Sequence, residues 1–271
     1  MTFEEVQANA LEILKKLTDV CDKHGVNYVL AYGTLIGAIR HKDFIPWDDD
    51  IDILMPRPDY DRLMDLLEKN PEELAPYKVM NQYNTKNYPH NITRIIDPTT
   101  WLDVVNEKDC GLGVFVDIYT EDGLGNDFEE ATNYLWKSRK ISSLMFLAAR
   151  TKLHVGNTKG WKKILAKPFA YLYTHILGLE YFRKQSKKLY ENLDYGNSSY
   201  IACVRWCSYA PPREIFKKEW IEDTIKWPFG KYEFYIPREY DAMLKQVYGN
   251  YMQLPPEKDR TRHHLYKAYK K

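Results

Sequence analysis

The sequence predicts an α+β fold with a mixed sheet, flanking helices and a basic helical insertion or lobe. Two observations carry this prediction. Strand-like apolar stretches dominate the first 120 residues, and helical periodicity takes over from 127 to 192. The chain has 271 residues and is 44% hydrophobic, so it is able to bury a substantial core. It shows neither internal repeats nor low-complexity segments.

The first predicted element is an amphipathic helix in the N-terminal segment MTFEEVQANALEILKKL. Thr2 and Glu5 stand at the spacing of a capping box, and Gly25 is a helix stop signal. The apolar stretches that follow are short and are bounded by Gly, Pro or polar residues, which is typical of strands. The predicted strands are, in chain order, 27–32, 50–55, 77–82, 91–96, 101–105 and 113–120.

Two helices are expected among these strands. Gly33 and Thr34 predict a turn after the first strand, followed by a short helix over 35–41. Residues 58–69 predict a longer helix that has a proline near its start, where the missing N–H costs nothing.

The rest of the chain divides into a helical block and a mixed tail. The helical pattern of 127–192 is interrupted at 154–160. The tail shows two strand patterns, one helix pattern and a polar end, in the order 199–206, 231–237, 238–249 and 254–269. We therefore expect a core over 1–125, a basic helical insertion over 126–195, and a C-terminal segment over 196–271 that packs back on the core.

The charge distribution is strongly uneven. The net charge is only +1, but residues 131–190 contain thirteen Lys or Arg and a single acid, Glu180. That segment therefore carries +12 and the remaining chain carries −11, which indicates a basic face for an anionic partner. No recognised nucleic-acid-binding module accompanies this charge, so we expect no nucleic-acid partner.

The segment 160–179, GWKKILAKPFAYLYTHILGL, combines Trp161 and lysines with an apolar stretch that is too short to span a bilayer. It predicts peripheral contact between 131–190 and an anionic membrane surface. The alternative is an ordinary core helix with a solvated basic face.

Cysteine usage and the N-terminus bear on location. The N-terminus has neither a basic n-region nor a long apolar stretch, so it is not a secretory signal. The four cysteines are scattered and do not suggest a disulfide framework, and the pair at Cys203 and Cys207 has no second ligand pair for zinc. We expect a cytoplasmic protein, with the inner face of the membrane as an alternative.

Four carboxylates crowd into residues 48–52: Asp48, Asp49, Asp50 and Asp52. Side chains alternate along a strand, so Asp50 and Asp52 are expected to share one face. A divalent cation such as Mg²⁺ relieves their repulsion, and it can also hold a phosphate and neutralise charge during phosphoryl transfer. Asp117, a lone acid in the apolar strand VFVDIY, is the natural third ligand. The alternative is a solvated acidic cluster.

A calcium loop of the EF-hand type fits this segment poorly. Such a loop starting at Asp48 would need Gly at position 53 and Glu at position 59, where this chain has Ile53 and Asp59. The strand that ends before Gly33 and Thr34 instead suggests a phosphate site, because backbone N–H groups and a helix N-terminus follow it.

Three stretches carry a resemblance to a known family. They are GTLIGAIRHKDFIPWDDDIDILMPRPDYDRL from Gly33, VFVDIY from Val114, and YGNYMQLPPEKDRTRHH from Tyr248. Together they resemble the LicD family, which belongs to the nucleotidyltransferase-fold superfamily. Gly33-Thr34 stands where that superfamily has Gly-Gly or Gly-Ser, a mild departure. The resemblance covers roughly 1–120 and 195–271 and is weakest over the basic block.

The resemblance implies a Mg²⁺- or Mn²⁺-dependent transferase with a nucleotidyltransferase-like core. LicD-like proteins move phosphocholine from CDP-choline to a sugar hydroxyl of a lipid-linked, cell-surface glycopolymer precursor of the teichoic acid or lipopolysaccharide type. Their relatives fukutin and fukutin-related protein transfer ribitol phosphate from CDP-ribitol. Alternatives are another CDP-alcohol donor, carrying ribitol or glycerol phosphate, a true nucleotidyltransferase that releases pyrophosphate, and a non-catalytic scaffold.

By the same resemblance, Asp50, Asp52 and Asp117 are the expected metal ligands and catalytic residues. Asp48 is a supporting acid. Asp117 or Asp52 is expected to accept the proton of the attacking hydroxyl, with Asp117 favoured.

Several other residues are candidates for substrate binding, each with a structural alternative. Arg40 and His41 either contact phosphate or pair with the neighbouring aspartates. Trp47 either stacks on a base or packs the loop. Arg94 is a lone cation on an apolar strand and needs an anionic partner if it is buried.

The C-terminal motif and the aromatic residues complete the candidates. Arg260 and His263 in DRTRHH either contact phosphate or belong to a fraying tail. A quaternary ammonium group is usually held over aromatic faces near a carboxylate. Candidate rings for such a cage are Trp101, Tyr119, Trp206 and Tyr209.

Overall fold

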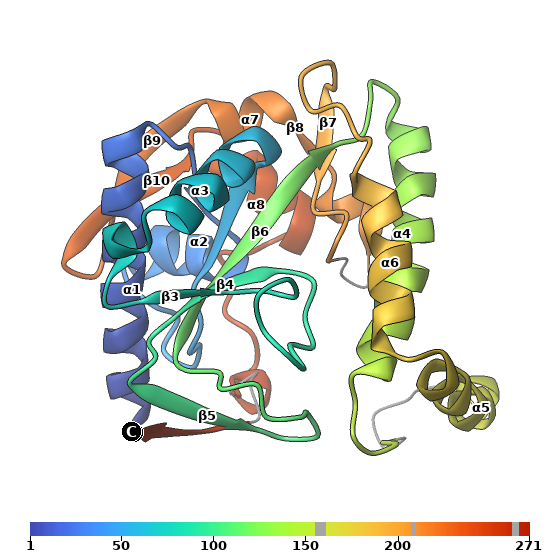
Figure 1. Ribbon diagram of the computed structural model, residues 1–271. Coiled ribbons are helices and arrows are strands. Elements are labelled where there is room, and N and C mark those ends of the chain that lie inside the picture. Colours follow the sequence, from blue (N-terminus) through green and yellow to red (C-terminus); the bar gives the residue numbers. More distant parts are fainter. Residues whose placement is uncertain (155–160, 207–209, 262–265) are drawn as a thin grey trace.

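A computed structural model describes residues 1–154, 161–206, 210–261 and 266–271, and it confirms the α+β class (Figure 1). Within these residues the main sheet has seven strands and mixes parallel with antiparallel pairs. Its strands run in the order β1 (Val29–Leu30), β2 (Asp52–Pro56), β6 (Phe115–Gly123), β4 (Thr93–Ile96) and β3 (Lys78–Met80), while β7 (Tyr200–Ala202) joins the far end of β6 and pairs with β8 (Phe216–Lys217).

Helices from the first third of the chain pack on this sheet. They are α1 (Phe3–His24), α2 (Tyr32–Arg40) and α3 (Arg57–Lys69), followed by the short η1 (Pro71–Leu74). The predicted capping box is present, since the Thr2 hydroxyl accepts from the Glu5 N–H and the Glu5 carboxylate accepts from the Thr2 N–H. α1 ends at Gly25, which adopts a left-handed conformation with φ 62°.

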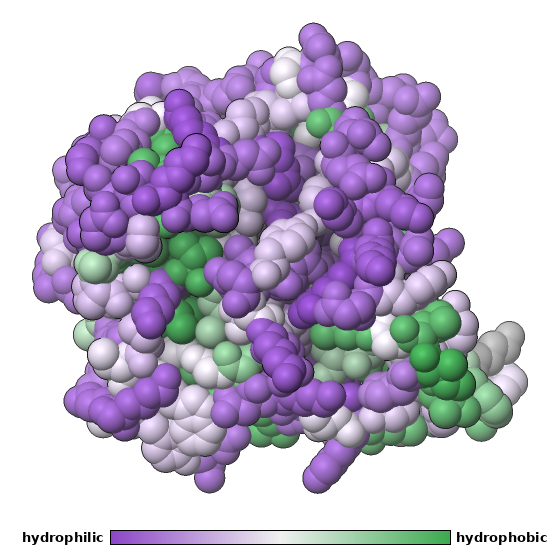
Figure 2. Space-filling view, in the orientation of Figure 1, coloured by the Kyte–Doolittle hydropathy of each residue, from purple (hydrophilic) through white to green (hydrophobic). Residues whose placement is uncertain are grey.

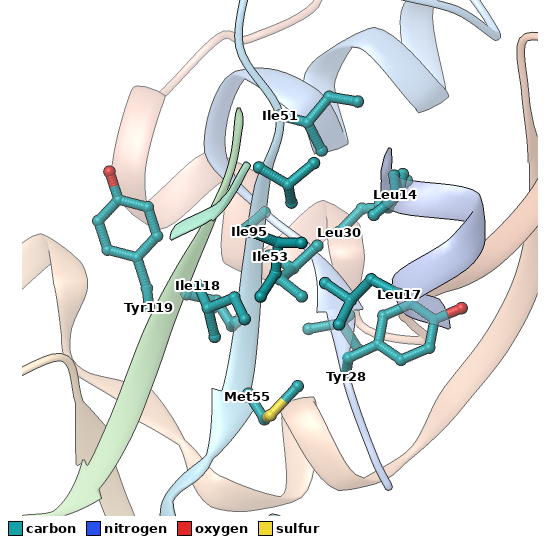
Figure 3. Packing of buried hydrophobic residues seen from close by; sticks show 14 of the residues in the cluster. Leu14, Leu17, Tyr28, Leu30, Ile51, Ile53, Met55, Ile95, Ile118 and Tyr119 are labelled. Carbon is teal, nitrogen blue, oxygen red and sulfur yellow. The ribbon is translucent and has the colours of Figure 1, made fainter. Parts of the chain in front are cut away.

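The main core lies between α1 and the sheet (Figure 3). Leu14 and Leu17 of α1 meet Ile53 of β2 and Ile118 of β6, and all four are fully buried. Tyr119 points away from this cluster to the opposite face of β6. That opposite face is where Asp117, two residues away, also lies.

The basic block forms a helical lobe beside the sheet (Figure 1). Its helices are α4 (Phe128–Ala148), α5 (Trp161–Leu177) and α6 (Leu179–Tyr190). α4 packs along α6, and α5 contacts both of them at one end of the lobe. A second hydrophobic cluster, which includes Leu124, Leu135 and Leu189, joins the lobe to the far end of β6.

The C-terminal segment returns to the first part of the chain. The predicted strand 231–237 is one arm of a hairpin, and the predicted helix 238–249 follows it. The polar end, to which no element was assigned from the sequence, closes with a strand that pairs with β5, and the amine of Met1 donates to the carbonyl of Ala268 at 2.7 Å. These elements are η2 (Pro211–Glu214), α7 (Lys218–Glu222), β9 (Thr224–Phe229), β10 (Tyr232–Pro237), α8 (Tyr240–Tyr248), η3 (Glu257–Asp259), β11 (Tyr266–Lys270) and its partner β5 (Thr100–Val104).

Two boundaries near the acidic segment differ from the prediction. The helix predicted from residue 35 begins at Tyr32, so Gly33 and Thr34 lie in its first turn and not in a preceding turn. The strand predicted over 50–55 begins at Asp52, which leaves Asp50 in the approach to the strand. With these observed bounds, the N-terminus of α2 lies next to the start of β2, where the Ala31 N–H donates to the Asp52 carbonyl at 3.0 Å.

Candidate functional site

The site is built around two acids on neighbouring parallel strands. β2 and β6 pair in parallel, and their register places Asp52 directly beside Asp117. Residues paired in this way point to the same face of a sheet. Both carboxylates are buried, at 8% and 3% exposure. The sequence named Asp117 as the candidate third acid from a neighbouring strand, and the register places it on the strand next to β2, while its role as a ligand stays a prediction.

Arg94 completes the row across three strands. It pairs with Asp117 in the antiparallel register of β4 and β6. Its Nε donates to Oδ1 of Asp117 at 2.6 Å, and its Nη2 donates to Oδ2 at 3.3 Å. Of the two expectations for Arg94, the structure shows the pairing with an acid. Both oxygens of Asp117 are thereby already hydrogen-bonded.

The segment before β2 gathers the remaining acids. One carboxylate oxygen from each of Asp48, Asp49 and Asp50 lies within 4.8 Å of the others. Among the described residues, these three acids form the group whose oxygens lie close enough together to hold one metal ion. The ligand set predicted from the sequence was a different one, Asp50, Asp52 and Asp117. Asp49, which the prediction left out of the site, is buried and its carboxylate shares a hydrogen bond with the Tyr266 hydroxyl.

Asp52 provides the test of whether a cation fits here. Its Oδ1 is buried and has no hydrogen-bond partner among the residues that the structure describes. Burial raises the pKa of Asp52 well above its usual range, and the negative charges of Asp50, Asp117 and Asp48 add to that effect. A divalent cation takes oxygen ligands and would offset both the burial and the repulsion. The donor set present here therefore fits Mg²⁺ or Mn²⁺.

The N-terminus of α2 borders the acids. The Asp52 N–H donates to the buried hydroxyl of Thr34 at 2.9 Å, so Thr34 fixes the start of β2. A Cβ placed on Gly33 would lie 2.5 Å from Oδ2 of Asp48, so only glycine lets that carboxylate approach so closely. The first N–H groups of a helix have no partner within the helix and favour anions. Tyr32, at the start of α2, has a positive φ of 45°, a strained conformation of the kind that clusters at functional sites.

A second group of predicted residues is cationic. Arg40 donates to the His41 ring at 2.9 Å and to the Tyr251 carbonyl at 2.8 Å, so its guanidinium is used there and not on the neighbouring aspartates. Arg260 lies over the Trp47 ring, 5.6 Å from its centroid, and Trp47 packs against the core. Burial lowers the pKa of Arg40, and the positive charge of Arg260 lowers it further, so the two guanidinium groups lie near each other. Such a pair of cations is suited to an anion.

Aromatic rings border the acids on the outer face of the sheet. Tyr119 packs edge-on against Tyr32 at 5.2 Å and against Trp206 at 6.4 Å between centroids. The pKa of Tyr119 is raised, first by burial and then by the charges of Asp52 and Asp117. Tyr119 and Trp206 were among the candidate rings for an ammonium cage, and the structure brings them together.

Two residues from distant parts of the chain were missed by the sequence prediction. Tyr248 of α8 lies near Asp52, and the pKa of its phenol is raised by desolvation and then by the charges of Asp52 and Glu214. Glu214, at the end of η2, is buried, and its charge also raises the pKa of Tyr32. No local pattern marks either residue, because only the return of the C-terminal segment to the core brings them here.

The other candidates lie elsewhere. Trp101 of β5 stacks on Tyr269 of β11 at 5.3 Å, so it packs the small terminal sheet. Tyr209, Cys207 and His263 lie outside the described residues.

Comparison with known proteins identifies the family. Residues 25–106 match the family described as LicD/FKTN/FKRP, nucleotidyltransferase domain. The chain is 31% identical over 272 positions to the lipopolysaccharide cholinephosphotransferase LicD of Haemophilus influenzae, a match that covers 99% of this chain and 98% of that protein. An uncharacterized protein of Rickettsia typhi is 28% identical over 122 residues, covering 44% of this chain and 36% of that protein. The long match includes the acidic segment, the strand of Asp117 and the helical lobe, and on this evidence the chain belongs to the LicD family.

Proposed function

We propose that this protein transfers phosphocholine from CDP-choline to a sugar hydroxyl of a lipopolysaccharide-type glycan, with Mg²⁺ or Mn²⁺ as cofactor. Family membership makes the chain a phosphotransferase. The observation that carries the proposal is the row formed by Asp52, Asp117 and Arg94, with Asp48 and Asp50 beside it. The similarity to a cholinephosphotransferase along almost the whole of both chains argues against a non-catalytic scaffold.

Asp50, Asp52 and Asp117 would hold the cation, with Asp48 in support. The cation would supply charge neutralisation at the donor diphosphate. The N–H groups of Gly33 and Thr34 at the N-terminus of α2 would bind a phosphate oxygen.

The cationic group formed by Arg40, His41 and Arg260 would add positive charge on the donor side, and Trp47 would border the nucleotide. These side chains bind and orient the donor, which is the main work in phosphoryl transfer.

The proton of the attacking hydroxyl needs an acceptor among the acids. Asp117 was the favoured base from the sequence, with Asp52 as the alternative. Both oxygens of Asp117 accept from Arg94. Hydrogen bonds from a guanidinium make a carboxylate a poorer proton acceptor, so we favour Asp52 for this role, through the oxygen that the cation leaves available.

The surroundings favour choline over an uncharged alcohol as the head group. Tyr119 contacts Tyr32, and both Tyr119 and Tyr248 lie near enough to Asp52 for its charge to raise their pKa. The charge of the buried Glu214 raises the pKa of Tyr32 and Tyr248. Aromatic faces and a nearby carboxylate bind quaternary ammonium groups, and they offer no comparable gain to ribitol or glycerol.

A cavity of about 350 Å³, lined in part by Trp206, which contacts Tyr119, suits the acceptor sugar. It lies between the segment Pro89–Asn91, helix α4 and Trp206, and it combines the rings of Trp206 and Phe146 with several hydrogen-bonding side chains. His90 on its wall is close enough to Asp117 for that charge to influence the pKa of His90. Replacement Phe146→Ala should raise KM for a lipopolysaccharide acceptor with little change in kcat. An unchanged KM would exclude this cavity.

The donor and the reaction class are tested together by ³¹P NMR of the full chain with Mg²⁺ and, separately, CDP-choline, CDP-ribitol, CDP-glycerol and CTP. We expect slow release of CMP and phosphocholine from CDP-choline, and faster turnover when a lipopolysaccharide acceptor is added. Asp52→Asn should reduce CMP release by at least about 100-fold, whereas Asp65→Asn, an exposed acid on α3, should not.

The other outcomes redirect the proposal. CMP from CDP-ribitol or CDP-glycerol keeps the reaction class and changes the head group. Pyrophosphate from CTP indicates a nucleotidyltransferase. No turnover of any donor with acceptor present, together with donor binding that is insensitive to Mg²⁺ and to Asp52→Asn, overturns the proposed site.

A further inference from the structure

Helix α5 (Trp161–Leu177) turns its apolar side outward. Five large apolar side chains on it are between 60% and 77% exposed. Their spacing of four, four, three and four residues places them on one helical stripe. On the opposite side of the helix, Thr174 is fully buried. The residues of this α5 stripe are Trp161, Leu165, Phe169, Leu172 and Ile176.

This orientation is the reverse of that expected for an ordinary amphipathic helix, which buries its apolar stripe against the core. Figure 2 shows hydrophobic residues gathered at the corner of the molecule where Figure 1 places α5. Contiguous exposed apolar surface of this kind marks an interaction site. The sequence left open whether 160–179 is a core helix or a surface-binding helix, and the structure excludes a core helix.

The charge of the lobe selects the partner. α5 contains no acidic residue, and the segment 131–190, which forms most of the lobe, holds thirteen Lys or Arg against one Glu. Lys152 is exposed, and the segment Arg150–Lys152 lies along α5, with the His175 ring 3.0 Å from the Arg150 carbonyl. A second copy of this chain would bring two such basic lobes together at a cost in repulsion. An anionic surface avoids that cost.

We infer that α5 docks on an anionic lipid bilayer, with the α5 stripe at the boundary between headgroups and acyl chains. An interfacial helix of this type has one apolar face, often with Trp and Phe, and basic flanks. Basic residues near an anionic leaflet add attraction that decreases with salt. None of the described helices has both the length and the apolar character that a membrane crossing requires. The helix therefore lies on the bilayer.

The position of α5 fits this role. It sits at the outer, lower corner of the lobe (Figure 1), and the side chains of the α5 stripe are themselves exposed there, so the stripe is open to a lipid surface. α4, which α5 contacts, also lines the cavity assigned to the acceptor. Membrane docking is independent of the donor, and its test needs no turnover.

The experiment is flotation of the full chain with vesicles of phosphatidylcholine, alone or mixed with phosphatidylglycerol. We expect binding to the anionic vesicles that weakens with salt. Phe169→Asp should weaken that binding at least about tenfold, because it removes a large apolar side chain from the lipid boundary and adds a negative charge beside anionic headgroups. Val105→Asp is the matched control, since Val105 is 62% exposed, lies outside the lobe and gains the same charge. Hydrolysis of CDP-choline should be unchanged by either substitution.

Three results would overturn the inference. The first is no binding of the parent to either vesicle. The second is equal binding of Phe169→Asp and Val105→Asp. The third is a dimer detected by light scattering that Phe169→Asp dissociates, without vesicle binding, since the stripe would then join two copies of the chain. If the parent does not hydrolyse CDP-choline, that result would count against the proposed function and would leave the membrane inference unaffected.

Discussion

The guanidinium of Arg94 and the carboxylate of Asp117 form a two-point pair across neighbouring antiparallel strands, with their side chains only 7% and 4% exposed. Both charges are out of water, so each depends on the other for compensation. Arg94 also stacks on the Phe115 ring at 3.8 Å from its centroid.

Replacement Arg94→Met should therefore destabilise the fold strongly. It leaves the Asp117 carboxylate buried without its cation, which costs about 3–5 kcal/mol. Arg238→Met is the control, because the Arg238 pair with Asp223 is more than half exposed and its loss should cost no more than about 1 kcal/mol. The free energy of unfolding in urea, measured without divalent metal, compares the two variants. Equal losses in the free energy of unfolding would mean that the buried pair stabilises the fold no more than the exposed pair does.

The parallel register that joins Asp52 to Asp117 leads to a prediction about metal binding. If Asp50, Asp52 and Asp117 hold Mg²⁺, adding Mg²⁺ should stabilise the parent, by about 2.7 kcal/mol at 100 times the dissociation constant. Asp52→Asn should abolish that gain, and Asp65→Asn should keep it. Thermal unfolding with Mg²⁺ or with a chelator measures the effect.

Without metal, the same Asp52→Asn variant should be at least as stable as the parent. In the parent, the negative charge of Asp52 is repelled by Asp50, Asp117 and Asp48. Oδ1 of Asp52 also has no hydrogen-bond partner among the described residues. A parent that is indifferent to Mg²⁺ would contradict the proposed ligands. A variant less stable than the parent in chelator would show that the Asp52 charge has a structural role instead.

The predictable part of this site is local. Alternation along a strand was enough to place Asp52 on one face of its strand, because strand periodicity fixes the face on which a side chain lies. The apolar context of VFVDIY marked Asp117 as the candidate third acid, but neither segment encodes the parallel register that joins the two. Asp50 was placed in the same strand as Asp52, but pairing begins at the Ile51 carbonyl, which accepts from the Asp117 N–H at 2.8 Å. Strand ends depend on neighbours, which a single segment does not encode.

The part that could not be predicted depends on contacts distant in sequence. Tyr266 reaches Asp49 because the polar end of the chain pairs with β5, and polar residues gave no strand signal there. Tyr248 and Glu214 reach the acids by the same return of the chain. For α5, the sequence showed an amphipathic helix but not which side faces the protein, since that depends on the packing of α4 and α6.

The buried His90 predicts a pH dependence of stability. Burial lowers its pKa, Arg94 lowers it further, and Glu107, whose Oε2 lies 3.6 Å from Nε2, only partly opposes them. A histidine with a lowered folded pKa is neutral in the fold, while in the unfolded chain it takes up a proton near pH 6.5. The unfolded state then binds more protons, so stability falls as pH drops below about 6.5 until the folded pKa is passed.

Replacement His90→Gln should remove this contribution. The measurement is the free energy of unfolding of both proteins between pH 8 and pH 5, compared as a difference so that other groups cancel. We expect the parent to lose more stability than the variant on acidification. Parallel curves would show that His90 binds protons equally well in both states.

Two glycines of α2 allow activity and stability to be separated. A Cβ on Gly33 would lie 2.5 Å from the end of a side chain, Oδ2 of Asp48, which can move. A Cβ on Gly37 would lie 2.5 Å from the backbone oxygen of Asp43 and 3.3 Å from the Ile45 nitrogen, which cannot move without the loop. Gly37→Ala should therefore cost about 1–3 kcal/mol in stability, as overpacking does.

Gly33→Ala should unfold almost like the parent, because alanine favours the helix and offsets the contact. It should nevertheless reduce CMP release by about 10- to 100-fold, since it displaces Asp48 from the acids. Full activity in a stable Gly33→Ala protein would show that the position of Asp48 does not matter to the reaction.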